Sequence, residues 1–155
     1  MTEQALIRLT RRAKPGDRGD AGVGLTFDQR QRSRLRVRLD DGREAGILLP
    51  RGETLRDGDL LTGDDGVVVR VAAAPEPLSA AASDDPLLLA RACYHLGNRH
   101  VSLQIEPGRL AWLHDHVLDD MVRGLGLTVT MEQAPFQPEP GAYGAHGHGH
   151  HGHDH

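Results

Sequence analysis

Apolar and charged residues alternate along the chain from Arg34 to Leu39, in the order RLRVRL. Because successive side chains of a strand point to opposite faces, this pattern predicts a strand with one buried and one solvated face. The Asp41-Gly42 pair that follows favours a hairpin turn, and Ala45 to Leu49 supplies a returning strand. The first half of the chain is therefore predicted to be all-β.

A second turn signal, Asp65-Gly66, precedes the apolar run 67–71, which predicts another short strand of the same small sheet or barrel. The segment LRDGDLL is expected to turn tightly and enter a short strand of its own. The sheet is predicted to end near Val71. The small and Pro-containing residues 72–83 fit a linker that runs into the first strand of a second unit.

The hydrophobic period changes after this linker. Asp85 followed by Pro86 is typical of a helix start, the next apolar residues recur at helical spacing, and Gly97-Asn98 favours a helix end. Two alternating segments around Pro107-Gly108 predict a hairpin, Asp115 is a candidate cap of a second helix, and LTVTME predicts a last strand. The resulting order, β-α-β-β-α-β, is that of ferredoxin-like domains.

The predicted fold class is α+β, with a small all-β domain in residues 1–74 and a ferredoxin-like domain in residues 75–135. Residues 136–155 are rich in Pro, Gly and His and are predicted to form a disordered tail.

Composition and charge narrow the classes of function. A net charge of −4 and a pI near 6.2 give no general electrostatic reason to expect nucleic acid or a membrane as a partner. No segment resembles a secretory signal or approaches the ~20 apolar residues of a membrane span, so a cytoplasmic location is expected. The phosphate-binding loop and the nucleophile motif of hydrolases are both missing from the sequence, which argues against an enzyme.

The histidines are the main candidates for chemistry. His114 and His116 flank Asp115 where a strand passes into a helix, and an extended backbone through this point would put both imidazoles on one side. Two imidazoles beside a carboxylate suit a borderline divalent ion such as Ni(II), Cu(II) or Zn(II). The alternative is a surface turn whose histidines bind nothing.

His95 and His100 bracket LGNR at the end of the first predicted helix. His95 is expected to lie on a helix face, half packed against the sheet. His100 follows the helix end and can project from the surface, where a symmetric dimer would bring two copies together.

The end of the chain, HGHGHHGHDH, interrupts its histidines with Gly and Asp, unlike the unbroken run of a purification tag. Short His-rich tracts of this kind favour metal binding. The candidate ligands here are His146, His148, His150, His151, His153 and His155.

Three other features have simpler interpretations. Cys93 is the only cysteine, which excludes a Cys-rich zinc site, and it is expected to be a small buried hydrophobe. Asp119 and Asp120 diverge by ~100° on a helix, so they are assigned to its polar side. Five arginines at every second position, from Arg30 to Arg38, indicate the solvated face of a strand or a docking strip for an acidic protein.

Three stretches together resemble the UreE family of urease accessory nickel metallochaperones: DDPLLLARACYHLGNRHVSLQI, HDHVLDDMVRGLGLTVT and LDDGREAGILLPRG. The similarity covers almost the whole chain, including PFQPEPGAYG and the His-rich end. The resemblance implies an N-terminal domain for protein docking and a second domain that dimerises and binds metal. It also implies that His100 is the principal ligand, meeting its symmetry mate in a homodimer, and that His114 and His116 form a peripheral site.

The function that the resemblance implies is delivery of Ni(II) for assembly of the urease active site. Its partners would be the urease accessory GTPase (UreG) and the complex of urease apoprotein and accessory proteins. The alternative is a His-rich storage or buffering protein without a delivery role.

Overall fold

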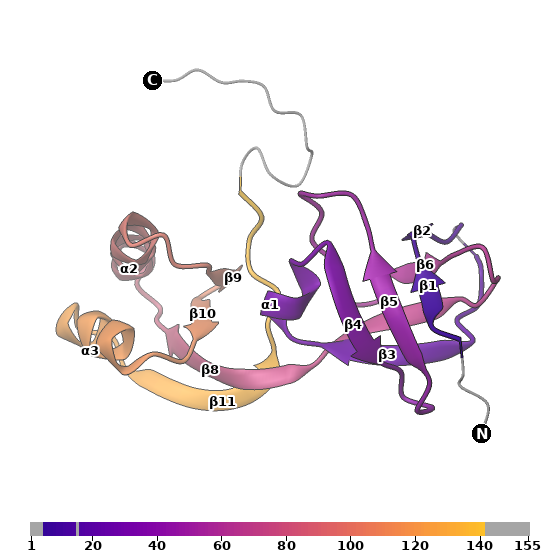
Figure 1. The fold of residues 1–155 in the computed structure, drawn as a ribbon. Helices are drawn as coiled ribbons and strands as arrows, with labels where there is room; N and C mark the ends of the chain where they lie inside the picture. The colour runs from indigo at the N-terminus through magenta and orange to yellow at the C-terminus, as the bar shows by residue number, and fades with distance from the viewer. Residues whose placement is uncertain (1–4, 15, 142–155) are drawn as a thin grey trace, which may run out of the picture. The chain divides into compact units, whose positions relative to one another are not determined.

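A computed structural model describes residues 5–14 and 16–141 of the chain. The chain divides into two compact units, the first ending at Ala74 and the second comprising Pro75–Glu139 (Figure 1). No helix in the described part is long and apolar enough to cross a membrane.

The first unit contains two sheets that share one aliphatic core. The three-stranded sheet has the order β1 (Ile7–Leu9), β5 (Glu44–Leu48), β4 (Arg34–Arg38). The four-stranded sheet has the order β2 (Arg11–Arg12), β6 (Leu60–Thr62), β7 (Val69–Ala73), β3 (Ala21–Leu25).

The predicted hairpin is confirmed as the antiparallel pair of β4 and β5. Val37 lies opposite Ala45 in the register, and both side chains are buried, whereas the arginines of β4 are exposed. The turn contains Gly42 at a φ of 94°, a left-handed conformation that glycine adopts without the steric cost that a Cβ would add. The alternation in the sequence thus reports burial correctly along this strand.

The prediction that the first half is all-β and that the arginines share one strand face is wrong at its beginning. Phe27–Arg30 form a short helix, α1, which starts with a capping box between Thr26 and Gln29. Arg30 ends this helix and is buried, while Arg32 lies in the turn that follows and pairs with Asp28. Only the last three arginines, which belong to β4, lie on an exposed strand face.

The second unit has the predicted order of strands and helices. Its elements are β8 (Pro75–Ala82), α2 (Pro86–Asn98), β9 (Gln104–Glu106), β10 (Arg109–Leu113), α3 (His116–Gly124) and β11 (Val129–Pro135). The four strands form an antiparallel sheet in the order β11-β8-β10-β9. The split order arises because each helix connects two strands that are not neighbours.

The prediction of a linker in residues 72–83 is wrong over most of its length, because Pro75–Ala82 form the longest strand among the described residues. This strand, β8, pairs with β10 on one side and with β11 on the other. The small residues of β8 allow close packing. Ala81, for example, lies in the core beneath the helices, opposite Leu110 of β10. Small side chains leave room for a helix to approach a sheet closely.

Both helices pack on the sheet through their apolar stripes. Ala92 and Leu96 of α2 join Leu118 and Val122 of α3 in one core with Trp112 of β10, which has no exposed surface. Asp85 caps α2 and Asp115 caps α3, as predicted. These caps determine where each helix begins and therefore where the flanking histidines lie.

Order continues past Pro135, where a tail was predicted to begin. Phe136 is fully buried, and the backbone N–H groups of Gln137 and Glu139 donate to Gln104 and to the Leu103 carbonyl. The predicted tail therefore starts too early. Its histidines, and the expectation of disorder from residue 142 onward, lie outside the described residues.

Candidate metal centre

The histidines of HDH lie at the junction of β10 and α3. The backbone of Asp115 is extended, with φ −156° and ψ 119°, and its carboxylate accepts from the N–H groups of Val117 and Leu118. His116 is then the first helical residue and is exposed. The strand-to-helix junction that the sequence predicts is confirmed, with Asp115 used as a cap.

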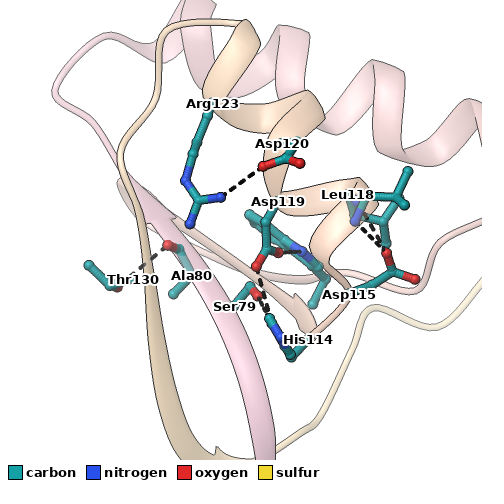
Figure 2. Close-up of polar contacts among 11 residues, drawn as sticks. Ser79, Ala80, His114, Asp115, Leu118, Asp119, Asp120, Arg123 and Thr130 are labelled. Atoms are coloured by element: carbon teal, nitrogen blue, oxygen red, sulfur yellow. Dashed lines mark hydrogen bonds and ion pairs between the residues drawn. The ribbon is translucent and has the colours of Figure 1, made fainter.

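His114 is anchored through one nitrogen of its ring (Figure 2). Its Nδ1 lies 3.1 Å from Oδ2 of Asp119 and 3.0 Å from Oγ of Ser79. The other carboxylate oxygen of Asp119, Oδ1, accepts a hydrogen bond of 3.0 Å from Nε1 of Trp112. The His114 side chain is 34% exposed, whereas that of Asp119 is 2% exposed, so the imidazole sits between a buried polar network and solvent.

The assignment of both aspartates to the polar side of the helix is wrong for Asp119. Asp119 faces the sheet, where Trp112 and His114 occupy its two oxygens. Asp120 does lie on the solvated side, 72% exposed, and pairs with Arg123 (Figure 2). A buried carboxylate is costly unless it is hydrogen-bonded, and these contacts supply the compensation.

Asp119 and Ser79 are thus the site residues that the sequence analysis missed. One signal was available for Asp119: the indole N–H of a buried tryptophan needs an acceptor, and Trp112 is the only tryptophan in the chain. Ser79 gave no signal, because it lies in the segment predicted to be a linker.

His100 lies in the turn that ends α2, two residues after its last helical residue. Its N–H donates to the Gly97 carbonyl and the Val101 N–H donates to the Leu96 carbonyl, which together form a Schellman motif. His100 has a φ of 60°, and within the described residues it is the single non-glycine residue with a positive φ. Glycine is the usual residue at this position, so an exposed histidine is held there at a conformational cost.

Replacing His100 by glycine is therefore expected to stabilise the metal-free protein by about 0.5–1 kcal/mol. Relief of a left-handed side chain contributes about 1–2 kcal/mol, and the greater flexibility of unfolded glycine offsets part of this. Urea denaturation in the presence of a chelator measures the difference. The control is His95→Gly in the interior of α2, which should destabilise the protein by about 0.3–0.5 kcal/mol, because glycine is a still weaker helix former than histidine. Equal stabilities of wild type and His100→Gly would contradict the inference of strain.

His95 and Cys93 do not belong to a metal-binding cluster among the described residues. The His95 side chain is exposed, in contrast to the expected half-packed position, and its ring makes an edge-on contact with Tyr94. Cys93 is partly buried, and burial raises the pKa of its thiol, which disfavours the thiolate that a metal would bind.

The described part of one chain does not bring the candidate ligands together. Among residues 5–14 and 16–141, no group of three or more His, Cys, Asp or Glu side chains is placed to hold a metal ion. His100 follows α2, whereas His114 precedes α3 and His116 is the first residue of that helix. The C-terminal histidines lie outside the described residues.

Comparison with known proteins adds a second, independent line of evidence. Residues 4–74 match the family model of the N-terminal domain of the UreE urease accessory protein, and residues 76–155 match that of its C-terminal domain. The chain is 62% identical over 139 residues to the urease accessory protein UreE of Alkalilimnicola ehrlichii, covering 90% of this chain and 85% of that protein.

Two further relatives carry the same name. The urease accessory protein UreE of Pseudomonas putida strain GB-1 is 62% identical over 148 residues, which cover 92% of this chain and 90% of the relative. That of Proteus mirabilis is 56% identical over 142 residues, with 92% and 86% covered. Both family models together span nearly all of the sequence, and the chain therefore belongs to the UreE family of urease accessory proteins.

Proposed function

We propose that this protein is a homodimeric nickel metallochaperone that takes part in urease maturation, capturing Ni(II) and delivering it for assembly of the urease active site. Family membership is the observation that carries the link to urease, because the relatives are named urease accessory proteins. On this proposal the protein carries the metal as cargo and catalyses no reaction itself.

His100 is the principal ligand in this proposal. Its imidazole is exposed at the end of α2, in a conformation that glycine would adopt more readily, and a residue kept at a conformational cost is a candidate for function. One imidazole is a poor site, and a two-fold axis beside His100 would supply a second one. The second unit, proposed to be a ferredoxin-like domain for metal binding and dimerisation, presents this residue on its surface.

His114 and His116 form a peripheral site in the proposal, and the C-terminal histidines provide further ligands. Neutral imidazoles bind borderline ions such as Ni(II), Cu(II) and Zn(II) without the deep stability of a thiolate cluster. A carrier has to release its ion as well as collect it. Exchange of one imidazole at a time between His100 and the C-terminal histidines would serve both steps.

The proposed partners are the urease accessory GTPase (UreG) and the complex of urease apoprotein with its accessory proteins. The first unit is the proposed docking module. Arg34, Arg36 and Arg38 are exposed on one face of β4, and this face suits an acidic surface. Glu44 pairs with Arg36 and Arg38 and so neutralises part of the positive charge of this face.

Replacing His100 by alanine is expected to abolish the tightly bound Ni(II) ion of the dimer and to leave the fold intact. The side chain is exposed, so its removal costs no core packing, while the interface site loses both of its imidazoles at once. Calorimetric titration with Ni(II) measures the loss, and urease activity in cells measures the consequence.

The control is His95→Ala, which removes an exposed imidazole five residues earlier and should bind Ni(II) as the wild type does. A chain that ends at Gly144 should keep the tight ion as well, because it retains His100. Unchanged affinity in His100→Ala would overturn the assignment of the ligand. Loss of urease activation on truncation, with the tight ion still bound, would favour storage over delivery.

A further inference from the structure

We infer that Asp119 is a positioning residue for metal binding, which holds the His114 ring with its proton on Nδ1 so that Nε2 is the nitrogen available to a metal ion. The inference rests on the proposed function, in which His114 is a ligand. The His114 ring contacts Ser79 of β8 and Asp119 of α3 (Figure 2). Trp112 of β10 bonds to Asp119.

The donors and acceptors around the His114 ring determine which of its nitrogens carries the proton. An indole N–H only donates, so Oδ1 of Asp119 is an acceptor for Trp112. A carboxylate has no proton to give, so Oδ2 also accepts. Nδ1 of His114, 3.1 Å from Oδ2, therefore has to carry the hydrogen. An unprotonated Nδ1 would turn its lone pair toward a buried oxygen, at the cost of an unmade hydrogen bond.

The other ring nitrogen of His114, Nε2, is left to accept a metal ion. A neutral imidazole carries one N–H, so a proton fixed on Nδ1 leaves Nε2 with a free lone pair. Nε2 makes no hydrogen bond to any residue that the structure describes. The Ser79 hydroxyl, 3.0 Å from Nδ1, can donate or accept, so it fits either tautomer and the acceptor-only carboxylate of Asp119 decides between them.

The Asp119 carboxylate is held rigidly beside the His114 ring. Asp119 is fully enclosed and tied to Trp112, which itself has no exposed surface, so the carboxylate cannot turn to follow the imidazole. A carboxylate that holds a histidine in this way fixes its tautomer and its orientation and raises its basicity toward a metal. Loss of such a partner typically weakens metal binding by 10–100-fold.

The decisive variant is Asp119→Asn, which keeps the size of the side chain. The asparagine has one oxygen, and Trp112 can only donate, so that oxygen is taken by the indole. The amide NH₂ then faces Nδ1 of His114 and donates to it, which moves the ring proton to Nε2 and blocks the metal-binding nitrogen. Asp120→Asn is the matched control, because it makes the same change of charge one residue later on the exposed side of α3.

The experiment uses the full chain with ¹⁵N-labelled histidines and metal-free buffer at pH 8. Long-range ¹H–¹⁵N NMR spectra report which nitrogen of the neutral His114 ring carries the proton. Addition of Ni(II) then gives the midpoint at which the His114 ring signals broaden. We expect Nδ1–H in the wild type and in Asp120→Asn, and Nε2–H in Asp119→Asn with a midpoint 10–100-fold higher.

A double variant separates a direct effect from a structural one. In the His114→Ala background, Asp119→Asn should change total Ni(II) binding no further, because Asp119 acts through His114 alone. An Nε2–H ring in the wild type would overturn the inference even if Asp119→Asn failed to fold, as would an unchanged midpoint in that variant. If His114→Ala itself bound Ni(II) as the wild type does, His114 would not be a ligand, and the peripheral site of the proposed function would fail with the inference.

Discussion

Replacement of Gly63 by alanine is expected to lower the free energy of unfolding of the first unit by about 3 kcal/mol. Gly63 directly follows β6, and a Cβ at this position would lie 1.8 Å from the carbonyl oxygen of Arg8 and 2.9 Å from its carbonyl carbon. Both are backbone atoms of β1, so no side-chain rotation relieves the overlap. The chain would have to separate here, where the Thr10 N–H also bonds to the Thr62 carbonyl.

Urea denaturation followed by circular dichroism, with hydrogen exchange of amides in β1 and β6, measures this loss. Gly24→Ala is the matched control in the same unit, because a Cβ on this strand residue would meet only the Cβ of Ala74, at 3.8 Å. That substitution should change stability by less than about 0.5 kcal/mol. A Gly63→Ala protein as stable as Gly24→Ala would show that β1 and β6 tolerate separation.

The second large effect is expected from Arg30→Met, which should lower the free energy of unfolding of the first unit by about 3 kcal/mol. The Arg30 side chain is 1% exposed, and it donates through Nε to the Leu25 carbonyl and through Nη1 to the Leu55 carbonyl. Methionine fills much of the volume but donates nothing, which leaves the buried Leu55 carbonyl without this donor. The Leu25 carbonyl is less affected, because it also accepts from the Ala74 N–H.

Arg34→Met serves as the comparison for this variant. It makes the same chemical change on the exposed face of β4, and we expect it to alter stability by less than about 0.5 kcal/mol. Thermal unfolding of both variants, with hydrogen exchange of the Leu55 amide, measures the difference. The Leu55 N–H bonds to the Arg30 carbonyl, so its exchange should accelerate only in Arg30→Met. Similar stability of the two variants would contradict a structural role of the buried guanidinium.

These two arginines illustrate what periodicity can predict in this chain. Every second residue from 30 to 38 is an arginine, and the pattern is correct from Arg34 onward because a strand faces a core there. It fails at Arg30 because the local capping box of TFDQ starts a helix four residues earlier. That signal was present in the sequence, but period-2 alternation concealed it.

In the second unit the cap residues predicted the helix starts well, because an aspartate before a helix acts through its own nearest N–H groups. The first strand of this unit was predicted, but its residues, those of β8, were assigned to a linker, since prolines and alanines have low strand propensity. The sequence indicated His114 as a candidate ligand but not its contact with Asp119. That contact joins the end of a strand to the inner face of a helix.

The position of Trp112 also gives the molecule an optical property. The only indole of the chain is bonded to the same carboxylate that holds His114, through contacts of 3.0 Å and 3.1 Å. Open-shell ions such as Ni(II) and Cu(II) quench an excited indole at short range, whereas Zn(II), with a closed shell, does not. Under the proposed function, Ni(II) binding at His114 would therefore quench the fluorescence of Trp112, and its release would restore that fluorescence, so both steps could be followed without a dye.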